Sequence, residues 1–412
     1  MLKDYPLFTV IIPQKNRAEY IIHTLKTCMI QDYPNFEVIV SDDCSKDNSV
    51  EVIRELMSKD SRIKLFAHKK HLGMRDNFEF ALEQVRSGYV MALGGDDGLT
   101  PGCISRMYEI LMSTKKDLLT WTPAGFSYPD NEGGKNIFFI KRKNNNNEVK
   151  IIKSETFLNE LAETFLYQTD ECPMFYMKGV VSTTLVDRVK SRTPDKSFYY
   201  CPTPDGFSGI VLAGEVEDYA FTYEPLSIGG DTIKSQGRNY TSGEKKAREE
   251  ANQFFNDNIR RTMHVQLASQ QYSPLVTLMT ADFLLTARDL PGWPGKFKPI
   301  SFEALIRATF KLIEKSTHKN ELLIRELRIL RAIAIQHDLL YLFNDLLVTT
   351  KRRVVDSEEV YGFVLTNSIR FEGTELGIKN MYDASLAVNF LYHTCKNISL
   401  KGMFLLVKNT FM

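Results

Sequence analysis

The chain has 412 residues, of which 43% are hydrophobic, and this length and composition allow more than one packed core. Its 52 Lys and Arg residues almost balance 51 Asp and Glu residues, which argues against nucleic-acid binding by bulk electrostatics. The six cysteines are scattered without metal-ligand spacing, so we expect buried free thiols. We find no signal-peptide pattern and no apolar run near the ~20 residues of a membrane span, which predicts a cytoplasmic protein.

The first hundred residues alternate between strand and helix patterns. We expect strands at 7–12, 36–43, 63–68 and 89–93, and helices at 17–31, 48–58 and 77–86. Repeated strand–helix–strand units of this length predict a parallel sheet with helices on both faces.

The pattern changes after residue 100. A strand-like segment at 117–126 and a helix at 154–167 stand in a less regular region, and from about residue 241 the pattern is helical. We therefore predict a first domain over 1–240, with a ligand-binding half over 1–100 and a second half over 101–240. The predicted second domain, over 241–412, is all-helical.

Polar clusters follow three of the predicted strands. PQKNR (13–17) follows the first strand, SDDCSKD (41–47) ends the second, and GGDDG (94–98) follows the fourth. In parallel sheets, ligands bind at the carboxyl ends of the strands. These clusters therefore predict one shared site at that edge of the sheet.

The pair Asp96-Asp97 has two interpretations. The two acids can belong to a turn and cap the helix that starts after Pro101. Alternatively, they can hold a divalent cation, because carboxylate oxygens together with substrate phosphates are the usual ligands of Mg²⁺ and Mn²⁺. A second acidic pair at the same edge, Asp42-Asp43, favours the binding interpretation. A carboxylate there can accept hydrogen bonds from a nucleobase or a ribose.

The segment TVIIPQKNRAEYIIHTLKTCMIQDYPNFEVIVSDDCSKDNS strongly resembles the opening of family-2 glycosyltransferases. HLGMRDNFEFAL and SGYVMALGGDDGLTPG resemble the next segments of the same family, in the same order. The resemblance implies a GT-A fold that binds a nucleotide-diphosphate sugar, with a mostly parallel twisted sheet flanked by helices. It also implies inverting sugar transfer of the kind that builds bacterial surface polysaccharides such as capsule or O-antigen.

The resemblance also implies roles for individual residues. Asp43 would face the nucleobase, Arg75 would approach the donor, and Asp96 would face the ribose or the metal. Asp97 would ligate a Mg²⁺ or Mn²⁺ ion that bridges the two phosphates. The remaining donor-binding residues would line the nucleotide pocket, and they are Pro13, Gln14, Lys15, Asn16 and Arg17.

Two positions depart from the family pattern. Lys15 stands where many members have an aromatic side chain that can stack on the base, which leaves the identity of the base open. Gly94 stands where the acidic motif often has an earlier Asp, so that only Asp96 and Asp97 are left to hold a metal.

An inverting transfer needs a base that takes the proton of the acceptor hydroxyl. We predict Asp205, in YYCPTPDGFSG, as this catalytic base, because some members have a similar Pro-x-Pro-Asp segment and PLSIGG (225–230) matches a later stretch. The alternative to a catalytic role is a plain turn. The rival bases are Glu217 and Asp218, but their segment alternates like a strand, which favours a solvated or structural role.

The sequence therefore predicts a metal-assisted inverting glycosyltransferase that uses a single displacement. We expect a nucleotide-sugar donor, with a UDP-sugar favoured, and a glycan or lipid-linked acceptor. We also expect peripheral contact with the inner face of the membrane and self-association through the helical domain. One alternative is a non-catalytic scaffold that binds sugar nucleotides or glycans. A third reading, a nucleotidyltransferase, would need a glycine-rich phosphate loop, and PQKNR has no glycine.

Overall fold

The fold is taken from a computed structural model, which describes residues 5–130, 136–141, 148–235, 249, 262–314, 320–350, 368–374 and 377–394. The N-terminal part forms the centre of an eight-stranded sheet with the strand order β3-β2-β1-β4-β10-β6-β11-β9. Its parallel strands are β1 (Phe8–Gln14), β2 (Phe36–Asp42), β3 (Ile63–Ala67) and β4 (Tyr89–Ala92). They are connected by α1 (Ala18–Met29), α2 (Ser49–Met57) and α3 (Met74–Glu83). The predicted parallel α/β arrangement is confirmed. Every residue of β1 and β2 is buried, as expected when helices cover both faces.

The second half of the chain extends this sheet. β10 (Gly179–Ser182) lies antiparallel between β4 and β6 (Leu118–Trp121). β11 (Asp218–Thr222) runs parallel to β6, and β9 (Val149–Lys153) forms the antiparallel edge. The helices of this half are α4 (Cys103–Thr114), α5 (Ser154–Thr164), α6 (Thr183–Arg192) and α7 (Gly206–Gly214). The strand predicted at 117–126 is in fact two strands, because the chain leaves the first sheet after Trp121 and enters a second one.

The second sheet has five strands in the order β13-β8-β7-β12-β5. Its strands are β5 (Gly98–Leu99), β7 (Ala124–Ser127), β8 (Ile137–Lys141), β12 (Ser227–Asp231) and β13 (Ser368–Glu372). β5 directly follows the acidic pair, and β12 pairs with it in antiparallel register. The second sheet therefore begins at the candidate site.

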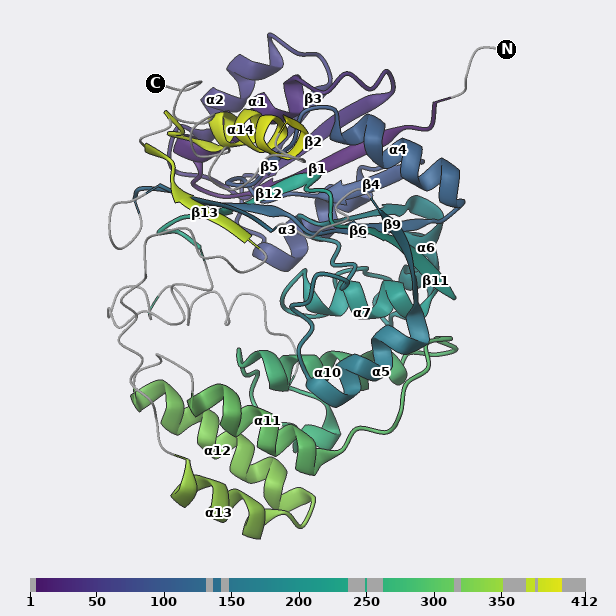
Figure 1. Cartoon of the computed structure of the whole chain (residues 1–412), viewed down its shortest axis with the longest axis vertical. Helices are drawn as coiled ribbons and strands as arrows, with labels where there is room; N and C mark the ends of the chain where they lie inside the picture. Colours follow the sequence, from purple (N-terminus) through teal and green to yellow (C-terminus); the bar gives the residue numbers. More distant parts are fainter. Residues whose placement is uncertain are drawn as a thin grey trace.

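The last described helix, α14 (Met381–Thr394), packs against α1 and the second sheet (Figure 1). The hydroxyl of Ser385 donates a hydrogen bond of 2.6 Å to the carbonyl of Leu99, and the buried Met381 lies against Gly98. Residues 368–394 thus return to the N-terminal part. Their assignment to a separate all-helical domain over 241–412 does not agree with the structure, because β13 finds its hydrogen-bonding partners on β8 and α14 buries its apolar face on the sheet.

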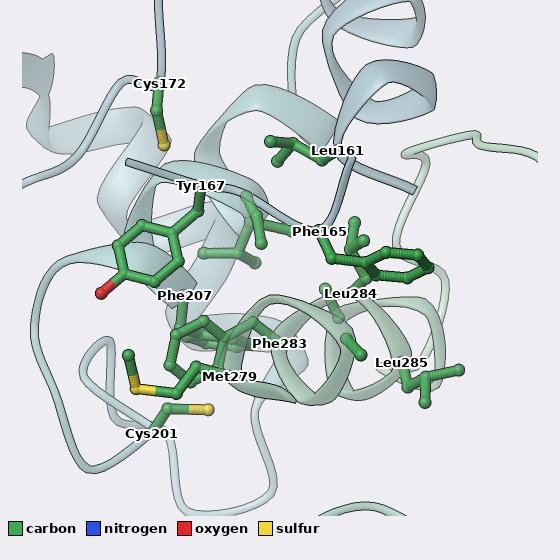
Figure 2. Packing of buried hydrophobic residues seen from close by; sticks show 14 of the residues in the cluster. Leu161, Phe165, Tyr167, Cys172, Cys201, Phe207, Met279, Phe283, Leu284 and Leu285 are labelled. Carbon is green, nitrogen blue, oxygen red and sulfur yellow. The ribbon is translucent and has the colours of Figure 1, made fainter. Parts of the chain in front are cut away.

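The other C-terminal helices lie below the sheets in Figure 1. They are α10 (Val276–Arg288), α11 (Phe302–Glu314), α12 (Asn320–Gln336) and α13 (Leu340–Thr349), preceded by the short helix η1 (Val265–Leu267). One hydrophobic core runs from α7 into these helices, and Figure 2 shows Phe283 of α10 close to Tyr167 and Phe207. The predicted boundary near 240 lies outside the described residues.

Two sequence expectations concern the whole chain. Among the described helices, none is long and apolar enough to cross a membrane. The five described cysteines are free thiols, and Cys28, Cys103, Cys172 and Cys201 are buried as expected, whereas Cys44 is half-buried. The sixth, Cys395, lies outside the described residues.

Candidate functional site

The ends of β1, β2 and β4 bring the three polar clusters together. The strands are parallel neighbours, so their carboxyl ends meet at one edge of the sheet. The backbone N–H of Asp43 donates to the carbonyl of Gln14 at 2.9 Å, and the N–H of Asn16 donates to the hydroxyl of Ser45 at 2.8 Å. The convergence predicted from the sequence is therefore present in the structure.

The segment from Pro13 to Arg17 turns sharply at the end of β1. Asn16 has a φ of 53°, a left-handed conformation that Asn tolerates better than most residues, and its side-chain carbonyl accepts the N–H of Lys46 at 2.7 Å. Gln14 is buried and donates to Asp42, and among the described residues its Oε1 atom has no hydrogen-bond partner. This turn presents amide groups at the edge of the sheet.

Asp43 is buried, and its carboxylate holds the segment from His71 to Gly73. It accepts the backbone N–H of Leu72 at 2.6 Å and that of Gly73 at 3.2 Å, and the Nδ1 atom of His71 lies 2.6 Å from Oδ2. Lys15 stands beside the same ring, with Nζ 3.0 Å from Nδ1 of His71. Asp43 thus holds the segment 71–73 against the end of β2. Its contact with a nucleobase stays a prediction.

Arg75 is buried, and its guanidinium binds a neighbouring loop. It donates to the carbonyl of Tyr199 at 2.5 Å, to Asp195 at 2.6 Å and to the hydroxyl of Ser197 at 2.6 Å. These bonds fasten α3 to residues 195–199. The structure thus shows a loop-fastening role for Arg75, and its approach to the donor remains a prediction.

Asp97 is buried in the loop between β4 and β5. Its Oδ2 atom accepts the N–H of Gly94 at 2.7 Å, and its Oδ1 atom accepts the N–H of Gly230 at 2.9 Å. The hydroxyl of Thr24 donates a hydrogen bond of 2.6 Å to the carbonyl of Asp97 and so connects the loop to α1. Burial, followed by the negative charge of Asp96, raises the pKa of Asp97 to about 7.

Asp96 is also buried but has fewer partners. Its Oδ2 atom accepts the hydroxyl of Thr232 at 3.2 Å and lies 3.8 Å from the guanidinium of Arg17. Lys234 lies next to Arg17. Its backbone carbonyl accepts a hydrogen bond from the Arg17 guanidinium at 2.9 Å, and its ammonium donates to the carbonyl of Asn16 at 3.0 Å. The cationic side chain of Arg17 therefore lies close to the acidic pair, and that of Lys234 lies at the turn beside it.

The sequence reasoning missed Thr232 and Lys234 as site residues. Both follow PLSIGG, which matched the family pattern, but nothing in the local sequence indicated that this strand ends at the acidic pair. The pairing of β12 with β5 and β7 brings them there. The polar residues directly after PLSIGG were the signal in the sequence that could have indicated Thr232 and Lys234 as site residues.

The two acids suit a small divalent cation in the chemistry of their ligand atoms. Both supply hard carboxylate oxygens, and a cation would relieve the repulsion between them, which after burial is the second cause of the raised pKa of Asp97. Among the described residues, no group of three or more His, Cys, Asp or Glu side chains could hold a metal. A cation here would therefore depend on further oxygen atoms from substrate or water.

Asp205 directly precedes α7, and its two carboxylate oxygens differ in environment. The hydroxyl of Tyr167 donates to Oδ2 at 3.0 Å, whereas Oδ1 is buried and has no hydrogen-bond partner among the described residues. An oxygen without a donor can accept a proton from an incoming hydroxyl. The structure therefore holds Oδ2 and leaves Oδ1 buried without a donor among the described residues.

Of the rival acids, Asp218 is the first residue of β11, in the segment whose alternation predicts a strand, and Glu217 directly precedes it. The side chain of Glu217 is 87% exposed and pairs with Lys153 at 3.0 Å. Asp218 pairs with Lys153 at 3.0 Å and also with Lys116, and its pKa lies below the usual value: burial opposes the shift, but the bonds to Lys116 and Lys153 outweigh it. These pairs give both acids structural partners on the surface.

Residues 9–177 match the model of the family described as Glycosyl transferase family 2. A Campylobacter jejuni protein named GalNAc(5)-diNAcBac-PP-undecaprenol beta-1,3-glucosyltransferase is 33% identical over 25% of this chain and 34% of its own length. A Bacillus subtilis protein named as a putative teichuronic acid biosynthesis glycosyltransferase, TuaG, is 30% identical over 26% of this chain and 42% of its own length.

An uncharacterized glycosyltransferase of Haemophilus influenzae is 28% identical over 32% of this chain and 51% of its own length. The chain thus spans between a third and about half of these relatives. A solved structure of S. aureus TarS in complex with UDP-GlcNAc has a TM-score of 0.45 and 14% identity, over 82% of this chain and 90% of that one. The sheet order and the family match over residues 9–177 indicate a GT-A-like α/β fold, and the structure adds a helical C-terminal region.

Proposed function

We propose that this chain, which carries a glycosyl transferase family 2 domain over residues 9–177, is an inverting glycosyltransferase that moves a sugar from a nucleotide-diphosphate sugar to an acceptor hydroxyl. The observation that carries the proposal is the arrangement of one sheet edge. Three strands end there in polar clusters, the buried pair Asp96-Asp97 belongs to one of them with Arg17 close by, and Lys234 binds the turn at Asn16. These are the charges that a metal-bound diphosphate requires.

The donor would lie along this edge with its diphosphate at the acidic pair. Arg17 and Lys234 supply positive charge for phosphate oxygens, and the turn at Gln14 and Asn16 supplies amide groups for the nucleoside. Asp43 would stand at the base end of the pocket and shape it through the segment 71–73 that it holds. A UDP-sugar is the first donor to test.

A Mg²⁺ or Mn²⁺ ion would be held by Asp96 and Asp97. When bound, such an ion offsets the negative charge that develops on the departing diphosphate. Asp96 has the fewer protein partners, so it is the freer of the two to turn toward a cation. Asp97, which is bonded to two backbone N–H groups, keeps the loop in shape while it contributes an oxygen.

Asp205 would act as the catalytic base of a single displacement. The acceptor oxygen attacks the anomeric carbon, its proton passes to Oδ1 of Asp205, and the bond from the anomeric carbon to the diphosphate oxygen breaks. Tyr167 supports this role because it donates only to Oδ2 and so fixes the direction of the free oxygen.

The acceptor is proposed from the relatives. The Campylobacter jejuni relative is named for an undecaprenol-linked glycan and the Bacillus subtilis one for a teichuronic acid. We therefore propose a surface glycan, soluble or lipid-linked, as acceptor. A lipid-linked acceptor would bring the protein to the membrane surface as a peripheral protein. Self-association stays a prediction, which light scattering would test.

The test is a panel of UDP-, GDP- and dTDP-sugars, assayed for thermal stabilisation and for hydrolysis with Mn²⁺. We expect one donor to stabilise the protein and to be hydrolysed slowly. Asp97→Asn should remove the metal-dependent part of the donor hydrolysis. Asp205→Ala should keep donor binding but lose sugar transfer. Stabilisation by a donor without hydrolysis or transfer would favour the alternative of a non-catalytic scaffold, and loss of donor binding in Asp205→Ala would mean that the base is misassigned.

A further inference from the structure

We propose that Tyr176 is a positioning residue that stands in place of the acid missing at position 94 and holds the carboxylate of Asp97 for the cation. Tyr176 precedes β10 in the second half of the chain, far in sequence from the acidic pair. The inference rests on the proposed function, since it concerns the metal site of that function. It explains how a site with only two acids can be complete.

The geometry at Gly94 shows that three side-chain oxygen atoms lie around this residue. A Cβ atom at this position would lie 2.8 Å from the hydroxyl of Tyr176, 2.9 Å from Oδ2 of Asp97 and 3.0 Å from Oδ1 of Asp96. Cβ atoms in proteins do not approach other heavy atoms below 3.0 Å, so every side chain larger than that of glycine requires a shift. Three oxygen atoms thus surround the space that a side chain at residue 94 would need.

The Tyr176 hydroxyl lies beside the Asp97 carboxylate, on the side of Gly94. The N–H groups of Gly94 at 2.7 Å and Gly230 at 2.9 Å donate to this carboxylate, and the hydroxyl stands next to them as the neighbouring third donor group. A carboxylate has about four lone-pair sites, so about one remains for a cation, and its direction is fixed by the other three. A hydroxyl also brings no further negative charge to two buried acids that already repel each other.

The backbone holds Tyr176 in place against the acidic loop. The N–H of the next residue, Met177, donates to the carbonyl of Ala92 at the end of β4, at 2.7 Å. The ring of Tyr176 meets the buried ring of Phe78 edge-on at 5.9 Å. The hydroxyl is therefore fixed relative to the loop that carries Asp96 and Asp97, as a positioning role requires.

The experiment measures Mn²⁺ binding to the full chain, without donor, by the electron paramagnetic resonance signal of free Mn²⁺. Loss of a residue that orients a metal ligand typically weakens metal binding about tenfold or more, and we expect this from Tyr176→Phe. The matched control is Tyr128→Phe. Tyr128 is also buried, and the charges of both acids act on it, but its hydroxyl bonds to neither carboxylate. This control should bind Mn²⁺ like the unmodified protein.

A second variant, Gly94→Ala, tests the same contact from the other side; if Tyr176→Phe is unstable, Gly94→Ala alone should still weaken Mn²⁺ binding. The added Cβ collides with the Tyr176 hydroxyl, so Gly94→Ala should weaken Mn²⁺ binding less in the Tyr176→Phe background than alone. Equal binding by Tyr176→Phe and the unmodified protein, or an equal loss in Tyr128→Phe, would overturn the inference and leave the proposed function standing. No Mn²⁺ binding by the unmodified protein would overturn the metal role itself.

Discussion

The backbone N–H of Gly230 donates a hydrogen bond of 2.9 Å to Oδ1 of Asp97, although 133 residues separate the two in sequence. Two residues further, Thr232 bonds to Asp96 at 3.2 Å. The end of β12 and the residue that follows it therefore contact both acids. The site is built by both halves of the N-terminal part, and each half can be tested separately.

Gly230→Ala should disrupt the site. A Cβ atom at this position would lie 1.9 Å from the backbone carbonyl of Asp96, which cannot move aside without moving the acidic loop. We expect weakened Mn²⁺ binding and a lower free energy of unfolding, measured by spin resonance and urea titration. Gly229→Ala is the matched control, because its nearest contact is the flexible side chain of Met177, at 2.6 Å. An equal effect of both variants would contradict this reasoning.

The raised pKa of Asp97 predicts a pH dependence of stability. Burial and the charge of Asp96 raise this pKa to about 7, above its usual value in an unfolded chain. The stabilisation from the protonated form is therefore complete below pH ~4 and is lost as the pH rises through about 7. At about 1.4 kcal/mol for each pKa unit, the loss is on the order of 4 kcal/mol at most.

Urea unfolding with EDTA between pH 5 and 8 would measure this dependence. The free energy of unfolding should fall with rising pH in the unmodified protein and fall less in Asp97→Asn, which carries no charge at this position. Added Mn²⁺ should reduce the fall, because a cation favours the ionised carboxylate. Parallel curves for the two proteins would show that Asp97 does not titrate in this range.

Tyr167→Phe tests how Asp205 is held. Without the hydroxyl that donates to Oδ2 at 3.0 Å, the carboxylate loses its fixed direction. A hydrogen bond to a charged group contributes about 1.5–3 kcal/mol, so we expect sugar transfer to fall about tenfold or more while the donor affinity is unchanged. The measurements are the rate of transfer at saturating donor and the dissociation constant of the donor. A change in donor affinity alone would place Tyr167 on the donor side.

Phe283→Ala tests the continuity of the core. Phe283 is fully buried on α10 and contacts Tyr167 and Phe207, so the cavity should cost about 3–5 kcal/mol of unfolding free energy. Val348→Ala, at a side chain that is 85% exposed, should cost about 0.5 kcal/mol or less. Because one core joins α7 and α10, we expect a single unfolding transition in calorimetry. Two transitions, with only one shifted by Phe283→Ala, would mean separate cores.

The sequence by itself determined the first half of the sheet and the place of its site. The four predicted strands of this half are present, at residues 8–14, 36–42, 63–67 and 89–92. They could be predicted because short apolar runs alternate there with segments of helical periodicity. A helix between two neighbouring strands of one sheet makes a parallel crossover connection. The edge on which the polar clusters meet followed from this topology, since parallel strands end on the same side.

Tertiary structure decided what the side chains do at that edge. Gly230, Thr232 and Lys234 reach the acidic pair only because β12 pairs with β5, and no local pattern encodes that pairing. The return of β13 and α14 onto the N-terminal part depends in the same way on strand pairing and apolar burial between distant segments. The periodicity of a sequence indicates which face of a helix or strand is buried. Which other segment covers that face is decided by long-range contacts. The position of the Tyr176 hydroxyl beside Gly94 is such a contact, and only the folded chain shows it.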